Sequence, residues 1–471
     1  MRSMDIGVMG LAVMGQNLAL NIESRGYSVA VYNRTADRTR AFMDDRAVEK
    51  QIEAAYNMED FVSSLTRPRK VLLMVKAGAP TDALIEQLLP LLESGDILMD
   101  GGNAHFEDTD RRCQLAAERG VQYLGVGVSG GEIGALLGPA IMAGGSENAY
   151  EIVGPILEAI AAIGPQGPCC AFFGPRSAGH YVKMVHNGIE YAIMQALCEA
   201  YDLMKRGLGM SADEMADIFA KWNNAELESY LVAITEKILR QSDPEGTGPL
   251  VEQILDTAAQ KGTGKWSSQS ALDLGAPSPS IAAAVFARIT SSLKPERAEA
   301  EPLLPGPSSS LSMKRDEAVP ALFSAALVSS ICSYSQGFRQ LLVASRERNY
   351  GLDLAEVARV WMAGCIIRSR LLVPMGEAFI RQPDLSLLLL AEPFRSLWEK
   401  HQEGFRSVVA NAHGAGIPVP AMSSALDFVD AYRTGRLPAN LLQAQRDFFG
   451  AHTYQRIDRD GTYHTEWEQV R

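Results

Sequence analysis

The chain has 471 residues and a formal net charge of −12, and hydrophobic residues make up 47% of it. This composition is typical of a folded globular protein with two to four domains, because a domain averages about 150 residues. It excludes a single small module, a disordered chain and a protein that wraps nucleic acid or anionic lipid non-specifically. Any anionic ligand must therefore be held by a few local cations.

The six cysteines form neither CxxC pairs nor the Cys/His spacing of a zinc site. We therefore expect buried thiols in a reducing compartment and no metal site. No apolar run reaches the roughly 18 residues of a membrane span, and Asp5 interrupts any secretory signal near the N-terminus. These features predict a soluble cytoplasmic protein.

The N-terminal third alternates short aliphatic runs with helical stretches. Strands are predicted at residues 5–9, 28–32, 71–75, 97–99 and 121–126. Such alternation is typical of βαβ units, in which helices connect parallel strands. We therefore predict a Rossmann-type α/β domain with a parallel sheet over residues 1–178.

The first predicted strand runs into a turn of small residues that precedes a helical pattern. The turn is Gly10-Leu11-Ala12-Val13-Met14-Gly15, with alanine in place of the middle glycine. Small residues here let a pyrophosphate approach the helix N-terminus and its unpaired N–H groups. A tight turn without a ligand is the alternative, but the strand before it and the helix after it favour dinucleotide binding.

The second predicted strand ends in Asn33-Arg34-Thr35. In NAD-binding proteins a carboxylate at this place bonds the adenosine 2′-hydroxyl. This chain has no acid there, and the Arg34 guanidinium can hold a 2′-phosphate with two parallel N–H groups. We therefore predict NADP rather than NAD as the cofactor, with a surface turn capped by Arg34 as the alternative.

Beyond Gly179 the strand pattern stops, and long amphipathic segments such as residues 182–206 and 212–221 follow. A Pro/Ser-rich stretch at 302–312 interrupts this region, and a break at 435–438 precedes the end of the chain. We predict a large all-α domain over residues 179–434 and a C-terminal tail over residues 435–471.

The helical region repeats itself, because residues 209–216 recur as residues 351–358 at an offset of 142. Both copies carry an N-cap residue and a glutamate three positions later, which is the sequence of a capping box. The pairs are Ser211 with Glu214 and Asp353 with Glu356. The sequence therefore predicts a duplicated helical unit.

Four polar residues share one face of the first long helix at about 100° per residue. They are Lys183, His186, Asn187 and Glu190. The alternative interpretation is a solvated stripe on an exposed helix. Gly188 favours a site, because glycine inside a helix costs about 1 kcal/mol relative to alanine and suggests that something approaches the backbone closely.

The duplication provides an internal comparison for this polar face. The corresponding residues of the second copy are Ala325, Val328, Ser329 and Cys332. None of the four polar groups recurs, although a face needed only for solvation would be polar in both copies. We infer that the first copy holds a functional site and that the second serves packing.

These motifs together resemble the 6-phosphogluconate dehydrogenase family over essentially the whole chain. Further motifs of the resemblance are Val75-Lys76-Ala77-Gly78, Asp100-Gly101-Gly102-Asn103, Gly127-Val128-Ser129-Gly130-Gly131, residues 260–266 and Gln445-Arg446-Asp447. Members of this family are decarboxylating enzymes of the pentose phosphate pathway. They oxidise C3 of 6-phosphogluconate by hydride transfer to NADP, lose C1 as carbon dioxide and protonate the enediol to ribulose 5-phosphate, without a metal.

The resemblance implies that Lys183 is the general base for the C3 hydroxyl and that Glu190 is the acid that protonates C1 of the enediol. These roles need a neutral lysine and a protonated glutamate, which burial favours. The implied substrate-binding residues are Asn103, Ser129, Gly130, Gly131, His186, Asn187, Tyr191, Lys261, Thr263, Arg288, Arg446 and His452. The implied NADP-binding residues are residues 10–15, Asn33, Arg34, Thr35, Val75, Lys76, Ala77 and Asn103.

In this family the C-terminal tail crosses to a second subunit, so the resemblance implies a homodimer in which Arg446 and His452 complete the partner's site. Two alternatives stay open. Another β-hydroxyacid dehydrogenase, such as a 3-hydroxyisobutyrate type, is disfavoured by the duplicated helical half and by the cations Lys261, Arg288 and Arg446. A non-catalytic NADP-binding sensor is disfavoured because both proposed catalytic residues are present.

Overall fold

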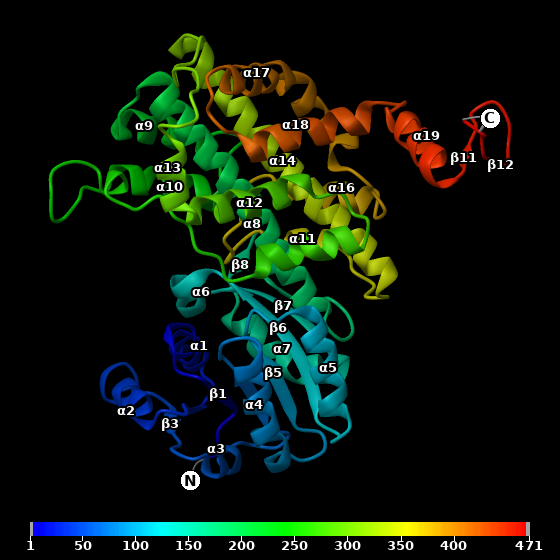
Figure 1. Cartoon of the computed structure of the whole chain (residues 1–471). Helices are drawn as coiled ribbons and strands as arrows, with labels where there is room; N and C mark the ends of the chain where they lie inside the picture. The colour runs from blue at the N-terminus through cyan, green and yellow to red at the C-terminus, as the bar shows by residue number, and fades with distance from the viewer. Residues whose placement is uncertain (1–2, 468–471) are drawn as a thin grey trace. The chain divides into compact units, whose positions relative to one another are not determined.

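Figure 1 shows the computed structural model of the chain, which describes residues 3–467. Contacts divide the chain into two compact units, Met1–Ala425 and Leu426–Arg471. The first unit holds a Rossmann-type sheet region followed by a large helical region, which confirms the predicted fold class. The domain boundaries at residues 178 and 434 stay predictions.

The sheet has eight strands in the order β10-β7-β6-β5-β4-β1-β2-β3 (Figure 1). Its strands are β1 Ile6–Met9, β2 Val29–Tyr32, β3 Ile52–Ala54, β4 Lys70–Leu73, β5 Ile97–Asp100, β6 Gln122–Ser129, β7 Ala140–Gly145 and β10 Cys170–Phe172. All five predicted strands are present. The sequence did not predict β3, β7 and β10, which are short or poor in β-branched residues. A separate hairpin pairs β8, Ile163–Gly164, with β9, Gly167–Pro168.

The predicted parallel sheet has one exception, because β7 runs antiparallel to β6. Between them lies only α6, Gly131–Leu137, which packs against α1 instead of crossing a face of the sheet. The chain therefore leaves and re-enters the sheet at the same edge. A parallel pair would need a crossover of a dozen or more residues along a face.

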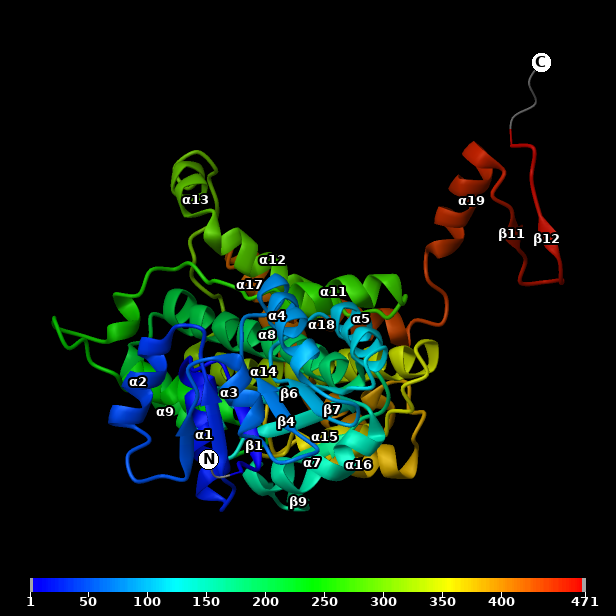
Figure 2. The ribbon, with the colours of Figure 1, turned by 90° about the horizontal axis from the view of Figure 1, so that it is seen from below.

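Helices cover both faces of the sheet. They are α1 Val13–Ser24, α2 Ala36–Asp45, α3 Met58–Ser63, α4 Ala79–Leu88, α5 Phe106–Ala117 and α7 Glu147–Ile160, with a 3-10 turn at Leu89–Leu91. Successive strand residues point to opposite faces, so Leu72 joins the core under α1, α2 and α7, whereas Val71 and Leu73 join the core under α3, α4 and α5. Figure 2 shows this layering from below.

The helical region begins with the 25-residue α8, Ala178–Asp202, which continues into a π-helical turn at Leu203–Gly207. The other helices are α9 Ala212–Trp222, α10 Tyr230–Arg240, α11 Thr263–Asp273, α12 Pro279–Ser292, α13 Lys294–Ala300, α14 Arg315–Glu347, α15 Leu354–Val360, α16 Leu372–Arg381, α17 Phe394–Gly414 and α18 Pro420–Arg433, with 3-10 turns at Leu250–Glu252 and Leu388–Leu390. Between α13 and α14 lies the predicted Pro/Ser-rich interruption. α14 packs against both α8 and α17.

α14 bears on the expectation that no segment of the chain spans a membrane. This helix has 33 residues and an 18-residue window with a mean hydropathy of 1.5, so by length and composition it could cross a membrane. However, 83% of that window is buried inside the protein. Such burial is typical of the central helix of a soluble protein.

Helices recur at the offset of the sequence repeat. α9 and α15 begin 142 residues apart, at Ala212 and Leu354, and α10 and α16 begin at Tyr230 and Leu372, the same distance apart. The long helices α8 and α14 precede these pairs, and α12 and α18 follow them. This recurrence supports the predicted duplication.

The two predicted capping boxes differ. Ser211 and Glu214 form a complete box, in which each side chain bonds the other residue's backbone N–H. The second prediction is half wrong: Asp353 accepts hydrogen bonds from two backbone N–H groups, but Glu356 binds Arg359 at 2.6 and 2.7 Å instead of the N-cap backbone. Attraction to a guanidinium replaces the reciprocal bond.

The expectation of buried thiols holds for Cys169, Cys170, Cys332 and Cys365. It is wrong for Cys198, which is exposed on α8 in the single chain, and Cys113 is half-buried. None of the six is in a disulfide.

The second unit contains the end of α18, then α19, Ala439–Gly450, and an antiparallel pair of β11, Tyr454–Gln455, and β12, Thr462–Tyr463. The predicted break at 435–438 lies between the two helices. The buried Asp447 carboxylate joins α19 to the segments after it, because it accepts hydrogen bonds from the Thr453 and Thr465 backbones, His464 and Trp467 at 2.9–3.0 Å. These donors hold the pKa of Asp447 at about 2 against the effect of its desolvation.

Candidate active site

The predicted ligand-binding segments of the sheet region follow the carboxyl ends of five neighbouring strands. Gly10 follows β1, Asn33 follows β2, residues 75–77 lie just beyond β4, Asn103 lies beyond β5, and Ser129 ends β6. The direction in which the chain adds strands reverses between β1 and β4. Ligands of doubly wound sheets bind at this edge, at the reversal point.

The glycine-rich turn is built as an anion site. Gly10 has a φ of +100°, which only glycine adopts without strain, and the Leu11 N–H donates to Asn33 Oδ1 at 3.1 Å. The Leu11 side chain is fully buried, so only its backbone is available to a ligand. α1 has no side-chain cap and no acidic residue in its first turn, which leaves the N–H groups of that turn available for an anion.

Three of the predicted NADP-binding side chains are accessible. Arg34, Thr35 and Lys76 are exposed, and Arg34 makes no ion pair with any of residues 3–467. Asn33 is already engaged, because its amide holds Leu11 on one side and donates to the Thr35 carbonyl at 3.1 Å on the other. Asn33 therefore shapes the turn, whereas the Arg34 guanidinium is free to meet an anion.

The polar face of α8 lies inside the protein. Lys183 and His186 are 5% and 0% exposed, and Asn187 is buried as well. The Lys183 ammonium donates to Asn187 Oδ1 at 2.7 Å. The interpretation of these residues as a solvated stripe is thereby excluded.

Hydrogen bonds connect this face to two other elements. Ser129 Oγ lies 3.2 Å from His186 Nε2, and the Asn187 amide donates to Thr263 Oγ1 at 2.9 Å. His186 Nδ1 lies 3.0 Å from Asn187 Oδ1, which only accepts, so Nδ1 carries the proton and Nε2 accepts from the Ser129 hydroxyl. The network thus fixes one tautomer of His186 and joins the end of β6, α8 and the start of α11.

Burial shifts the pKa values of the titratable groups on this face. Desolvation lowers the pKa of Lys183 below its ordinary value of 10.5, although Glu190 opposes the shift. Desolvation raises the pKa of Glu190 above 4.5, against the charges of Lys183, Arg288 and Lys261. Desolvation lowers the pKa of His186 well below 6.5, and the positive charge of Lys183 lowers it further. Burial therefore favours the neutral form of each group.

Gly127 and Gly188 allow other side chains to pack closely against β6 and α8. A Cβ on Gly127 of β6 would lie 2.5 Å from the Lys183 Cβ, so the glycine makes room for the lysine stem. A Cβ on Gly188 would lie 2.6 Å from Ser267 Oγ of α11. The group that approaches Gly188 is thus a neighbouring helix, so Gly188 gives no support to a ligand site.

The predicted phosphate-binding residues of the first unit come from α8, α11, α12 and the segment before α11. The Arg288 guanidinium lies 3.4 Å from the centre of the buried Tyr191 ring, a cation–π contact. Thr263 begins α11, and the exposed Lys261 is close enough to lower the pKa of Glu190. Arg446 and His452 belong to the second unit, where both are exposed, and Arg446 donates to Gln443 at 3.1 Å.

Two residues that the sequence did not indicate lie near the polar face. The Trp361 ring lies 5.6 Å from the His186 ring, centre to centre, at an angle of 76°. Cys365 lies close enough to Lys183 for each to affect the other's pKa. Both follow α15, and no local pattern marks residues so far along the chain as neighbours of α8. Within residues 3–467, no three His, Cys, Asp or Glu side chains gather as a metal site would require.

Family comparisons agree with this arrangement. The model for the NAD binding domain of 6-phosphogluconate dehydrogenase matches residues 5–174, and the model for the 6-phosphogluconate dehydrogenase C-terminal domain matches residues 179–467. The chain belongs to the 6-phosphogluconate dehydrogenase family. The match extends over both the nucleotide turn and the helical region.

Individual members of the 6-phosphogluconate dehydrogenase family are similar over their full length. The NADP(+)-dependent, decarboxylating 6-phosphogluconate dehydrogenase of Bacillus subtilis is 53% identical over 99% of this chain and 100% of its own. The Escherichia coli decarboxylating enzyme is 50% identical with the same coverage. The solved 6-phosphogluconate dehydrogenase of Plasmodium falciparum, studied with NADP+ and with 6-phosphogluconate, is 42% identical with a TM-score of 0.95, covering 98% of this chain and 100% of its own.

Proposed function

We propose that this chain oxidises and decarboxylates 6-phosphogluconate to ribulose 5-phosphate and carbon dioxide, with reduction of NADP to NADPH and without a metal. The observation that supports this proposal most directly is the buried hydrogen-bond network of α8 and β6. It joins Lys183, Asn187, His186 and Ser129, and Glu190 lies beside it. The network lies at the carboxyl edge of the sheet that the nucleotide would bind. The relatives that match over their full length are named for this reaction, and the one from B. subtilis is named for this cofactor.

Protons move through two side chains in the proposed mechanism. Bound NADP supplies the hydride acceptor. Lys183, whose pKa burial lowers, takes the proton of the C3 hydroxyl in its neutral form as the hydride leaves C3, and then returns a proton toward the C3 oxygen as the carboxylate is lost. Glu190, whose pKa burial raises, gives its proton to C1 of the enediol.

The remaining residues orient the substrate in this proposal. The Ser129-Gly130-Gly131 turn offers backbone N–H groups for the carboxylate, and Asn103, His186 and Asn187 face the hydroxyl groups. Tyr191, Lys261, Thr263 and Arg288 receive the phosphate. A few cations at the site thereby hold an anionic substrate on a chain whose net charge is −12.

The first test is absorbance at 340 nm with 6-phosphogluconate, using NADP and NAD in parallel, with and without a chelator. We expect NADP-dependent reduction coupled to carbon dioxide release at equal rates in both chelator conditions. Reduction only with 3-hydroxyisobutyrate would support the other dehydrogenase class. Binding of NADP, seen as a shift in thermal midpoint without turnover, would support a sensor. Loss of rate with the chelator would contradict the metal-free proposal.

Arg34→Ala should reverse much of the cofactor preference. Loss of two charge-assisted hydrogen bonds to the 2′-phosphate raises KM for NADP by about 10- to 100-fold, whereas KM for NAD changes little. Arg40→Ala is the control, because Arg40 lies on the next helix but already pairs with Asp37 at 2.7 Å. Equal effects of Arg34→Ala on the two cofactors would contradict a 2′-phosphate contact.

We further propose a homodimer in which Arg446 and His452 complete the site of the partner. Each unit of the chain leaves an apolar face uncovered within residues 3–467. In the second unit Leu441, Phe448, Phe449 and Trp467 line an open groove, and Phe449 is 73% exposed. In the first unit a groove between α8 and α10 is lined mainly by apolar side chains, and Phe286 of α12 is 68% exposed. Exposed apolar patches of this kind mark protein–protein contacts.

Subunit complementation tests whether Arg446 acts across the dimer. Arg446→Ala and Lys183→Met are each expected to be nearly inactive with 6-phosphogluconate. Co-expressed with different tags, they should regain about a quarter of the wild-type activity, because half of the dimers are mixed and each mixed dimer has one intact site. If Arg446 served its own subunit, no mixed dimer would hold an intact site and activity would stay absent. A monomer in sedimentation would contradict the dimer itself.

A cytoplasmic location belongs to the same proposal. All six cysteines are unpaired thiols, which suits a reducing compartment. A fluorescent fusion that co-fractionates with the envelope would contradict it.

A further inference from the structure

A buried arginine of α5 connects two loops at the ligand edge of the sheet. Arg112 is fully buried, and each of its guanidinium nitrogens donates a hydrogen bond. Nε donates to the Asp82 carboxylate at 2.8 Å and Nη2 to the Gly78 carbonyl at 3.2 Å, both at the start of α4. Nη1 donates to the Asp100 carboxylate, at the end of β5, at 3.1 Å. The planar guanidinium fixes the directions of these bonds, so it holds the start of α4 against the end of β5.

The Gly78 carbonyl belongs to the loop that follows β4. This loop, residues 75–78, contains three of the predicted NADP-binding residues and ends where α4 begins. Gly78 has a φ of +87°, which favours glycine, and its carbonyl also accepts from the Thr81 and Asp82 N–H groups at 2.9 and 3.2 Å. Arg112 therefore anchors the end of a loop that is predicted to touch the cofactor.

The Asp100 carboxylate carries the same network into the loop that follows β5. Its Oδ1 accepts from the Gly102 N–H at 3.0 Å, and its Oδ2 accepts from the Tyr123 hydroxyl of β6 at 3.1 Å besides Arg112. Gly102 precedes Asn103, which is predicted to bind both ligands. The loop of residues 100–103 is thus tied through Asp100 to Arg112.

The backbone of Asp100 also contacts the helix that carries Lys183. The buried His180 of α8 has its Nε2 3.0 Å from the Asp100 carbonyl oxygen, which only accepts, so Nε2 carries a proton and donates it. His180 Nδ1 lies 2.7 Å from the Thr109 hydroxyl of α5. His180 precedes Lys183 by three residues and therefore shares its side of the helix. The strand end that Arg112 holds is also the point where α8 meets the sheet.

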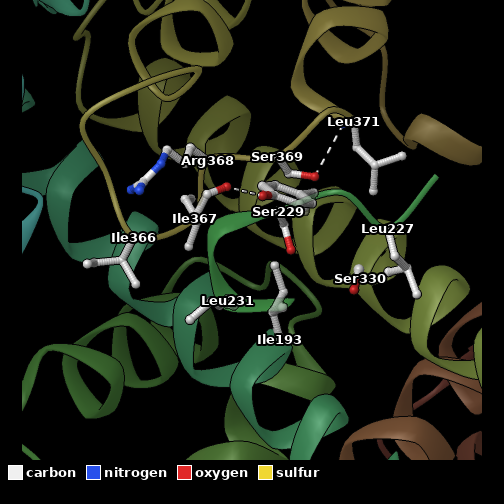
Figure 3. Close-up of a pocket in the computed structure, with 11 residues that line it drawn as sticks. Ile193, Leu227, Ser229, Leu231, Ser330, Ile366, Ile367, Arg368, Ser369 and Leu371 are labelled. Carbon is white, nitrogen blue, oxygen red and sulfur yellow. Dashed lines mark hydrogen bonds between the residues drawn. The ribbon is translucent and has the colours of Figure 1, made fainter. Parts of the chain in front are cut away.

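Arg368 provides a comparison with an arginine away from the ligand edge. It lines the small cavity in Figure 3 and donates to the Cys365 carbonyl, three residues earlier, at 2.7 Å. Its guanidinium also lies 3.8 Å from the centre of the Tyr230 ring. Neither partner is a predicted ligand-binding residue. Arg112 instead bonds groups 12, 30 and 34 residues away in the two loops that carry such residues.

We propose that Arg112 is a positioning residue: it holds loop 75–78 and loop 100–103 at a fixed separation, so that bound NADP and the substrate meet in the geometry that hydride transfer needs. The part of this inference that concerns NADP binding is independent of the substrate, whereas the part that concerns hydride transfer rests on the function proposed above. Rates of transfer between two bound molecules depend steeply on their separation, so a small shift of either loop has a large effect.

The same two strands carry a second buried ion pair at their opposite ends. Arg69 precedes β4 and Asp96 precedes β5, and the Arg69 Nη1 donates to the Asp96 carboxylate at 2.8 Å. Both residues are buried, but they lie at the amino edge of the sheet, away from the ligand edge. Arg69→Met is therefore the matched control for Arg112→Met, because both variants leave a buried aspartate without its partner and both should lower the thermal midpoint.

Calorimetric titration with NADP tests the proposal without turnover. Arg112→Met should raise Kd for NADP by about tenfold, because binding must then order a loop that the wild type holds in place. Arg69→Met should bind NADP like the wild type. An unchanged Kd in Arg112→Met, or an equal rise in the two variants, would overturn the proposal. If Arg112→Met does not fold, Arg112→Lys carries the same test, because lysine keeps the charge beside Asp100 but lacks the planar fork that reaches Gly78.

A single-turnover measurement tests the separation of the two loops. The enzyme is saturated with NADP and mixed rapidly with 6-phosphogluconate, and the rate of NADPH formation is followed at 340 nm. Arg112→Met should be about 10- to 100-fold slower than wild type even when both ligands saturate, whereas Arg69→Met should keep the wild-type rate. Equal rates in the two variants would contradict the proposal. A wild type that forms no NADPH would defeat the proposed function alone and leave the NADP titration decisive.

Discussion

Lys183→Met is expected to lower kcat for NADPH formation by about 10³-fold or more, the scale of a lost general base. Methionine keeps an unbranched stem that fills the space opposite Gly127, so the fold should persist. It offers no atom that takes the C3 proton. The initial rate at 340 nm with saturating 6-phosphogluconate and NADP measures the effect, and a thermal shift with NADP verifies that the cofactor still binds.

Lys70→Met provides the matched control for this variant. Burial lowers the pKa of Lys70 as it does for Lys183. Its ammonium, however, donates to the Asp5 and Pro68 carbonyls at 3.2 and 3.3 Å, at the amino end of β4 and away from the ligand edge. We expect its kcat to stay near that of the wild type. Similar rates for the two variants, or a Lys183→Met rate above about a tenth of wild type, would contradict Lys183 as the base.

Glu190→Gln is expected to lower kcat by about 10²- to 10⁴-fold, because the amide retains the shape of the side chain but gives up no proton. Glu190 acts as an acid only below its pKa, which burial raises, so wild-type activity should fall as pH rises through that value. The variant should lose this alkaline limb while it keeps the acidic limb that Lys183 produces. A pH series of kcat for both proteins measures the two limbs.

Glu199→Gln is the control that separates the loss of the proposed acid Glu190 from the loss of any buried carboxyl group. Glu199 lies on the same helix, and burial raises its pKa to about 7. Its oxygens accept from the Ala421 and Met422 N–H groups at 2.8 and 2.9 Å, so it anchors the start of α18. We expect a changed thermal midpoint and an unchanged kcat. An alkaline limb that survives in Glu190→Gln would show that another group is the acid.

Local patterns in the sequence determined much of this protein. The five aliphatic runs became strands because short buried strands need little more than β-branched and aliphatic residues between turns. The polar face of α8 followed from the helical period alone, since residues three and four apart share a face wherever the helix lies. The repeat at 142 residues likewise recurred as helices at that spacing. Each of these features depends on neighbours in the chain.

Other features were decided only by the tertiary structure, because they depend on residues far apart in the sequence. The direction of β7 follows from where α6 packs, and Gly188 is explained by Ser267 of another helix. Burial of Lys183 and Glu190, which shifts both pKa values toward the neutral forms, arises only when the sheet and helices enclose α8. Trp361 packs against His186 from about 175 residues away, a separation at which no sequence periodicity operates. The sequence therefore specified the polar face of α8, and long-range packing specified its environment.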